Sequence, residues 1–208
     1  SSTEICRVPL HNLEGIITFG YTGASPALMH ECAIRNINLT FLNKNGKFLA
    51  RVTGKQYGNV LLRKEQYRTS EDAEKSLYIA KSFIIGKLYN SRWVLERACR
   101  NYSMRIDTDE VKRKSHFLYE SIQKAEEISD IDTLRGCEGE AATMYFSVFN
   151  MLLLQQKEDF RFSLRSKHPP LDRINALLSF AYTLLTYMCE SALEAVGLDP
   201  YVGFMHAE

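Results

Sequence analysis

The chain has 208 residues, of which 45% are hydrophobic and 25% charged, and its formal net charge is +1. This composition is ordinary for a globular protein with a sizeable core, built as one large domain or two small ones. No uncharged apolar run reaches about 18 residues, so we expect no transmembrane helix. Residues 1–5 lack the basic and apolar regions of a signal peptide.

The five cysteines are widely spaced, and no Cys-x-x-Cys pair occurs. This spacing excludes a zinc ribbon. Reduced, mostly buried thiols in a cytoplasmic protein are the expectation.

The first 60 residues predict a small β-rich region with one short helix. Residues 15–19 are apolar and β-branched, and residues 37–42 alternate as in a partly buried strand. Residues 48–52 complete a hairpin with the second segment. Asn45-Gly46 between the last two strands is the pattern of a type I′ turn. Ser25 followed by Pro26 predicts the start of a helix that runs to Ile34.

Helical periodicity takes over near Tyr67. We expect helices over residues 70–100, 107–129, 131–156 and 171–196. The last is apolar on nearly every face, which predicts a central place in a bundle. The fold class is therefore α+β, with a β-rich N-terminal domain over residues 1–65 and a larger all-α domain over residues 66–208.

Glu138 is the first candidate for a functional residue. Its helical stripe is otherwise apolar and consists of Leu134, Ala141, Ala142 and Tyr145. Burying a carboxylate there is costly, so a cation, a metal or a shared proton must compensate it. Gly139 leaves room for a ligand to approach. The alternative is an exposed acid near a helix start, and Glu140 is the rival carboxylate.

His206 is the second candidate. It closes residues 197–206, an apolar segment interrupted by glycine and proline, where it could bind a metal or be structural. Asn175 and Tyr182 lie seven positions apart on the most apolar helix and need hydrogen-bond partners there. They could orient a metal ligand, or they could make ordinary hydrogen bonds in the core.

Residues 161–170 form a basic segment that contains no acid. Arg161, Arg165 and Lys167 could hold a phosphate backbone, with Phe162 available for stacking on a base. The alternative is a solvated loop between helices. Residues 111–114 add a second basic cluster, and a protein that is neutral overall can still bind a polyanion through such patches.

Three blocks of sequence, taken together, resemble one protein family. They are residues 134–142 (Leu-Arg-Gly-Cys-Glu-Gly-Glu-Ala-Ala), 169–182 (Pro-Pro-Leu-Asp-Arg-Ile-Asn-Ala-Leu-Leu-Ser-Phe-Ala-Tyr) and 197–206 (Gly-Leu-Asp-Pro-Tyr-Val-Gly-Phe-Met-His). In this order they resemble the CRISPR-associated integrase called Cas one, and residues 8–16 resemble a stretch of its β domain. The resemblance covers essentially the whole chain and is strongest to the version found in subtype I-C systems.

The resemblance implies a metal-dependent DNA endonuclease and integrase of antiviral defence, which inserts short foreign DNA into the CRISPR array by phosphoryl transfer. It also implies a homodimer, a Cas-two dimer clamped between two such dimers, and double-stranded DNA (protospacer and repeat) as substrate. The family's metal ligands map onto Glu138 and His206, which should then approach within reach of one ion. Carboxylate and imidazole ligands suit Mg²⁺ or Mn²⁺.

Both ends of the chain depart from the family pattern. The family's third ligand is an acid further on, whereas here the sequence stops at Glu208, which is not that ligand. The family's opening strands have no counterpart before Ser1. We therefore expect a truncated copy that can be inactive, with an open strand edge near residues 5–8 or 15–19 where the resemblance puts the homodimer contact.

Two other functions stay open. A catalytically silent DNA-binding or assembly scaffold of the same fold would lack a complete acid–histidine–acid set. An unrelated helical ligand-binding protein would leave Glu138 and His206 far apart.

Overall fold

The computed structural model describes residues 5–54, 59–167 and 169–205 and confirms the α+β class, with a small sheet followed by a helical region. The chain forms two compact units, each described by itself below. The sheet unit comprises residues 1–64 and 183–200, and the helical unit comprises residues 65–182 and 201–208. The two consecutive segments expected from the sequence, 1–65 and 66–208, differ from these units because residues 183–200 group with the sheet.

The sheet unit is built on three strands in the order β1-β2-β3. Strand β1 (Gly15–Phe19) runs parallel to β2 (Asn38–Leu42), and β3 (Phe48–Val52) pairs antiparallel with β2. A 3₁₀ turn, η1 (Leu10–Asn12), precedes β1, and helix α1 (Pro26–Ile34) connects β1 to β2. The Ser25 hydroxyl accepts a hydrogen bond from Leu28 N at 3.2 Å, which confirms the predicted helix start.

The turn between β2 and β3 is not the predicted type I′ turn. That turn needs positive φ at both Asn45 and Gly46, but only Gly46 has it, at 80°. The amide of Gly46 instead donates to Asn43 O at 2.9 Å, and the Asn43 side chain accepts from Asn45 N and Lys47 N. The side chain of Asn43 therefore fixes a longer turn, with glycine at its last position.

In the sheet unit, β1 lies at one edge of the sheet and bonds to β2 alone among the described strands. An open edge at residues 15–19 is therefore confirmed, whereas residues 5–8 form no strand. An edge strand offers unpaired backbone groups to a further strand.

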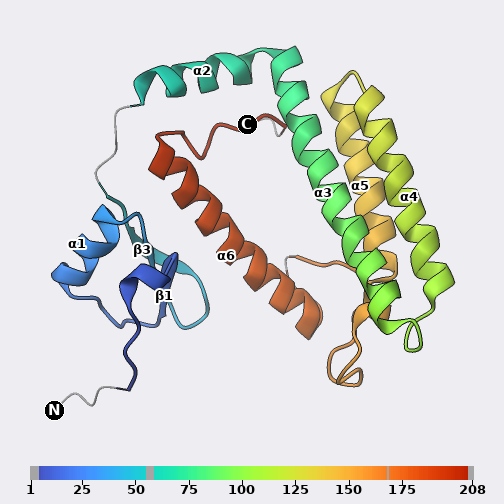
Figure 1. The fold of residues 1–208 in the computed structure, drawn as a ribbon, viewed down its shortest axis with the longest axis horizontal. Coiled ribbons are helices and arrows are strands. Elements are labelled where there is room, and N and C mark those ends of the chain that lie inside the picture. Colours follow the sequence, from blue (N-terminus) through green and yellow to red (C-terminus); the bar gives the residue numbers. More distant parts are fainter. Residues whose placement is uncertain (1–4, 55–58, 168, 206–208) are drawn as a thin grey trace. The chain divides into compact units, whose positions relative to one another are not determined.

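The helical unit is organised around three helices that run side by side (Figure 1). These are α3 (Ala73–Tyr102), α4 (Thr108–Glu127) and α5 (Ile131–Ser147). Their N-caps are Asp72, Asp107 and Asp130, each accepting from backbone amides of the first turn. The core between them is apolar, and its fully buried residues include Leu95, Val111, Leu118, Leu134 and Ala141.

Two helix boundaries differ from the sequence expectation. Helix α2 (Val60–Glu71) begins before Tyr67, where helix was expected to start. Its residues are good helix formers, but Gln66 is its one buried residue, so no apolar stripe marks it. Helix α5 stops at Ser147 rather than near Gln156 and leads into η2 (Phe149–Leu152).

Helix α6 (Arg173–Val196) contributes its first half to the helical unit and its second half to the sheet unit. Its buried residues in the described chain are Ile174 and Asn175. Because the helix belongs to both units, its predicted central place in a bundle stays a prediction. Of the described helices, α6 alone is long and apolar enough to cross a membrane, at a mean hydropathy of 1.2, a test that core helices also pass. Gly197, with φ of 85°, ends the helix in a Schellman motif.

Within the sheet unit, Arg51 joins β3 to the second half of α6. Its guanidinium pairs with Glu190 Oε2 at 2.8 Å and with the Glu194 carboxylate. These acids are one turn apart and face the same way. Phe48 adds a ring contact to Tyr187 with centroids 5.2 Å apart.

Candidate functional site

Glu138 lies on α5, whose start is fixed by the Asp130 cap. Asp130 Oδ1 accepts from Thr133 N at 2.8 Å, and that bond lowers the pKa of the Asp130 carboxyl. The buried side of α5 carries Leu134, Cys137 and Ala141, and Glu138 lies beside this side with its side chain 22% exposed. The carboxylate is therefore partly withdrawn from water, at the rim of the core rather than inside it.

The cation that compensates Glu138 comes from another helix. Lys87 Nζ on α3 donates to Glu138 Oε1 across 51 residues of sequence. Both residues belong to the helical unit, where α3 and α5 pack against each other. The ammonium group of Lys87 is thus the cation that compensates the carboxylate of Glu138.

The surroundings of Glu138 on α5 are open. A Cβ placed on Gly136 or Gly139 would meet no described heavy atom within 4 Å, apart from its own helix and neighbours. The rival carboxylate Glu140 is exposed. The two glycines therefore leave free space on the surface of α5 next to Glu138.

The segment before His206 is attached to α5. Arg135 Nη2, one turn before Glu138, donates to Met205 O at 2.8 Å. The Met205 side chain packs against the core of α3, α4 and α5. His206 itself lies outside the described residues, so its predicted approach to Glu138 stays a prediction. Within residues 5–54, 59–167 and 169–205 no group of three potential metal ligands occurs.

Phe162 is not available for stacking on a base, contrary to the sequence expectation. It is 3% exposed and packs in an aromatic cluster, with ring centroids 5.7 Å from Phe146 and 5.1 Å from Phe149. Its amide donates to Asn150 Oδ1 at 2.9 Å. Phe162 therefore anchors the basic segment to the helical unit.

Arg165 and Asn175 hold the same segment together. Asn175 is fully buried, and its Oδ1 accepts from Arg165 Nη1 and from Ser166 N, each at 2.9 Å. Its amide nitrogen donates to Leu164 O at 2.8 Å. The Arg165 guanidinium lies 5.6 Å from the centre of the Tyr182 ring. Asn175 thus makes core hydrogen bonds that shape the loop, and Arg165 is engaged by the protein.

Arg161 and Lys167 differ from Arg165 because both are exposed. They are the cations of the predicted DNA-binding set that face solvent most fully. The second basic cluster, residues 111–114, is partly neutralised, because Arg113 and Lys114 both pair with Glu110. The solvent-facing positive charge of the 161–170 segment is therefore the better candidate for a phosphate contact.

Tyr145 links α5 to Tyr182. Burial raises the pKa of the Tyr145 hydroxyl, and the neighbouring Tyr182 raises it further. Tyr145 lies two turns after Glu138, so Tyr182 is near the same helix. The roles predicted for Asn175 and Tyr182 beside a metal ligand stay predictions.

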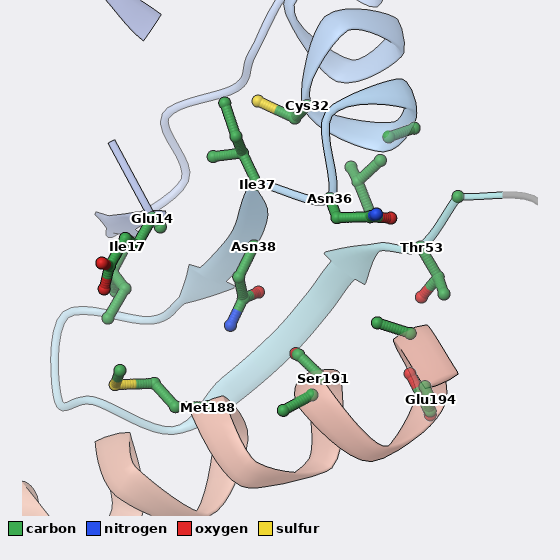
Figure 2. Close-up of a pocket in the computed structure, with 16 residues that line it drawn as sticks. Glu14, Ile17, Cys32, Asn36, Ile37, Asn38, Thr53, Met188, Ser191 and Glu194 are labelled. Carbon is green, nitrogen blue, oxygen red and sulfur yellow. The ribbon is translucent and has the colours of Figure 1, made fainter. Parts of the chain in front are cut away.

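The sheet unit holds a cavity of about 340 Å³ that involves none of the predicted site residues. Figure 2 shows Cys32, Ile37 and Met188 among its apolar lining residues and Asn38, Ser191 and Glu194 among its polar ones. The Ser191 hydroxyl is buried and has no hydrogen-bond partner among the described residues.

Comparison with known proteins decides the family. The family model described as "CRISPR associated protein Cas1" matches residues 1–208. The chain belongs to the Cas1 family. A curated relative, "CRISPR-associated endonuclease Cas1 1" of Chlorobaculum tepidum, is 44% identical over 99% of this chain. The chain spans 60% of that relative's length.

Solved structures agree with the Cas1 fold. A structure titled "Casposase bound to integration product" superposes with a TM-score of 0.73 at 29% identity, over 94% of this chain and 53% of its own. A chain of a structure titled "Cas6-RT-Cas1--Cas2 complex" has a TM-score of 0.69 at 24% identity, over 94% of this chain and 21% of its own. The latter likeness concerns the fold alone.

Two residues of the candidate site escaped the sequence reasoning. Lys87 is one of many cations on an amphipathic helix, and nothing local marks it as the partner of Glu138. Arg135 lies in the 134–142 block, directly before Gly136. Its position one helical turn before Glu138 is the sequence feature that could have indicated a role in the site. Both act through contacts of long sequence separation, which periodicity does not reveal.

Proposed function

We propose that this Cas1 chain carries part of a metal-dependent DNA endonuclease and integrase site, which inserts short foreign DNA into a CRISPR array. The observation that carries the proposal is the position of Glu138: it is partly withdrawn from water, paired with a cation, and next to Gly139, where a Cβ would meet no described neighbour. The attachment of Met205 to Arg135 supports a site that includes the segment leading to His206. The relative named as an endonuclease and the casposase titled as bound to an integration product are consistent with it.

Glu138 and His206 are the residues that would hold the metal, with a third acid supplied from beyond this sequence. The donor chemistry fits Mg²⁺ or Mn²⁺, because a carboxylate already in contact with an ammonium group favours a positive ion, and an imidazole suits Mn²⁺. A bound divalent ion would supply charge neutralisation at the reacting phosphate. The chain's own part is to hold Glu138 at a fixed place on α5.

Double-stranded DNA, as protospacer and repeat, is the proposed substrate. Arg161 and Lys167 would bind its phosphates from the solvent side of the basic segment. Arg165, bonded to Asn175, would set the shape of that segment. Backbone contacts of this kind position DNA without reading its sequence.

The proposed assembly is a homodimer that joins a Cas-two dimer in the cytoplasm. The open edge of β1 is the feature of the described chain that favours pairing with a second copy. Light scattering of the full-length protein at tens of micromolar tests it, because a monomer there would contradict the dimer. The assignment to subtype I-C rests on sequence resemblance alone.

The experiment is strand transfer of a short duplex into a repeat-bearing plasmid, with full-length protein, Cas-two and Mn²⁺. Glu138→Ala should abolish integration and metal-dependent cleavage, while the exposed Glu140→Ala should retain both. A folded Glu138→Ala protein with unchanged activity would contradict the proposal. The alternative is a silent scaffold of the same fold. A scaffold predicts DNA binding with no transfer by the unmodified protein.

A further inference from the structure

Lys87 and Glu138 are held together by packed helices rather than by two free side chains. Ile84 and Leu88 flank Lys87 on α3 and are buried, and Cys137 flanks Glu138 on α5 and is buried. The Glu138 side chain is 22% exposed, whereas that of Lys87 is 50% exposed. The ammonium group thus reaches the carboxylate from the solvent side and can leave it without disturbing the core.

The other described lysines of α3 have ordinary surroundings. Lys81 Nζ donates to Glu126 O at 2.9 Å, near the end of α4. Lys75 lies 3.7 Å from the Asp72 cap of its own helix. Lys87 differs because it pairs across helices with a partly buried acid. The ammonium group offsets the cost of withdrawing the Glu138 carboxylate from water.

We propose that Lys87 is the counter-ion of Glu138 in the metal-free protein and leaves this carboxylate when a divalent ion binds. This inference rests on the proposed function, in which Glu138 is a metal ligand. A divalent ion on this carboxylate would repel the ammonium group beside it, so the bound ion displaces Lys87. Lys87 therefore positions Glu138 before the metal arrives and lowers the affinity for it.

The expected change in metal affinity follows from the charge of Lys87. Two opposite unit charges about 4 Å apart in water attract by about 1 kcal/mol, and losing this attraction when the ion displaces Lys87 lowers the affinity by a factor of about five. Removing the ammonium while keeping the apolar stem, as in Lys87→Met, should tighten Mn²⁺ binding by about fivefold or more. Lys87→Arg keeps the charge and should stay within about twofold of the unmodified protein.

The test measures Mn²⁺ binding to the full-length protein by electron paramagnetic resonance, together with thermal unfolding in EDTA and in Mn²⁺. Lys87→Met should bind Mn²⁺ more tightly, unfold at lower temperature in EDTA, and gain more from Mn²⁺ than the unmodified protein does. Lys81→Met is the matched control on the same helix and should leave Mn²⁺ affinity unchanged. Lys87→Met with unchanged or weaker Mn²⁺ affinity would overturn the inference.

Glu138→Ala separates this inference from the proposed function. Loss of saturable Mn²⁺ binding in Glu138→Ala, with no effect of Lys87→Met, would reject the counter-ion role and leave the metal site standing. Retained Mn²⁺ binding in Glu138→Ala would reject both. In EDTA, the Lys87→Met and Glu138→Ala effects on unfolding should be non-additive, because each removes the same pair.

Discussion

Arg135 donates a hydrogen bond from Nη2 to the carbonyl oxygen of Met205, 2.8 Å away and 70 residues along the chain. The bond attaches the segment before His206 to the helix that carries Glu138. The same guanidinium uses Nη1 to bind Asp132 Oδ1 at 3.0 Å. One residue of α5 thus fixes the place where the two predicted ligand segments meet.

Replacing Arg135 should weaken the metal site without unfolding the helical unit. Arg135→Ala removes a charge-assisted hydrogen bond to the segment, so we expect Mn²⁺ affinity to fall on the order of tenfold. Asp132→Ala is the control, since it leaves the bond to Met205 in place. Equal Mn²⁺ affinities for both variants, measured by calorimetry, would mean that the attachment does not serve the site.

Replacing Gly139 should affect stability and activity in opposite directions. A Cβ there meets no described neighbour, so Gly139→Ala should stabilise α5 by about 0.5–1 kcal/mol, as should Gly86→Ala on α3. Chemical denaturation measures both changes. We expect strand transfer to fall for Gly139→Ala only, because DNA would approach Glu138 across that surface. Full activity of Gly139→Ala would show that the space is not used.

In the basic segment, we expect Arg161 and Lys167 to bind DNA phosphates and Arg165 to stabilise the loop. Arg161→Ala with Lys167→Ala should weaken binding of all duplexes alike and reduce the slope of log affinity against log salt by nearly two, at about 0.9 per phosphate contact. Stability should stay within about 0.5 kcal/mol, because both side chains are exposed. Arg113→Ala, at a site already paired with Glu110, is the control for the salt slope.

Arg165→Met should behave differently, because Arg165 is bonded to buried Asn175. We expect a lower melting temperature and faster proteolysis of the 161–170 segment, by comparison with the Arg161 and Lys167 variants. A normal melting temperature combined with a reduced salt slope would instead make Arg165 a direct phosphate contact.

We expect the buried hydroxyl of Tyr145 to make the folded protein less stable at high pH. Burial raises the pKa of its hydroxyl above the ordinary value of 10.0, so its contribution is complete below pH 10.0 and is lost as pH rises through the folded-state pKa. Tyr145→Phe should therefore lose less stability than the unmodified protein between about pH 8 and pH 11. Tyr78→Phe, at a side chain that is 74% exposed, should follow the unmodified protein. Thermal melts across this range make the comparison.

Local signals were enough to predict several elements of the fold. Ser25 and Pro26 marked the start of α1, and β1 has the predicted bounds, 15–19. Helix α2 escaped because burial at Gln66 alone leaves no stripe to read. The predicted type I′ turn failed because the side chain of Asn43 competed for the backbone amides that follow it.

The candidate site was less predictable than the fold. The requirement that Glu138 have a partner could be stated from its neighbours on the helix, but the identity of Lys87 depends on how α3 packs against α5. Phe162 looked available because cations surround it in sequence, yet an aromatic cluster buries it. The partner of Glu138 and the burial of Phe162 both depend on contacts between segments far apart in the sequence. Composition and residue spacing do not predict such contacts.

The most direct test of the central claim is the position of a bound metal in the full-length protein. Anomalous diffraction from crystals soaked in Mn²⁺ should show an ion bonded to the Glu138 carboxylate and the His206 imidazole at roughly 2.0–2.3 Å, with Lys87 no longer on that carboxylate. An ion bound elsewhere, or Glu138 still paired with Lys87 at saturating Mn²⁺, would contradict the claim.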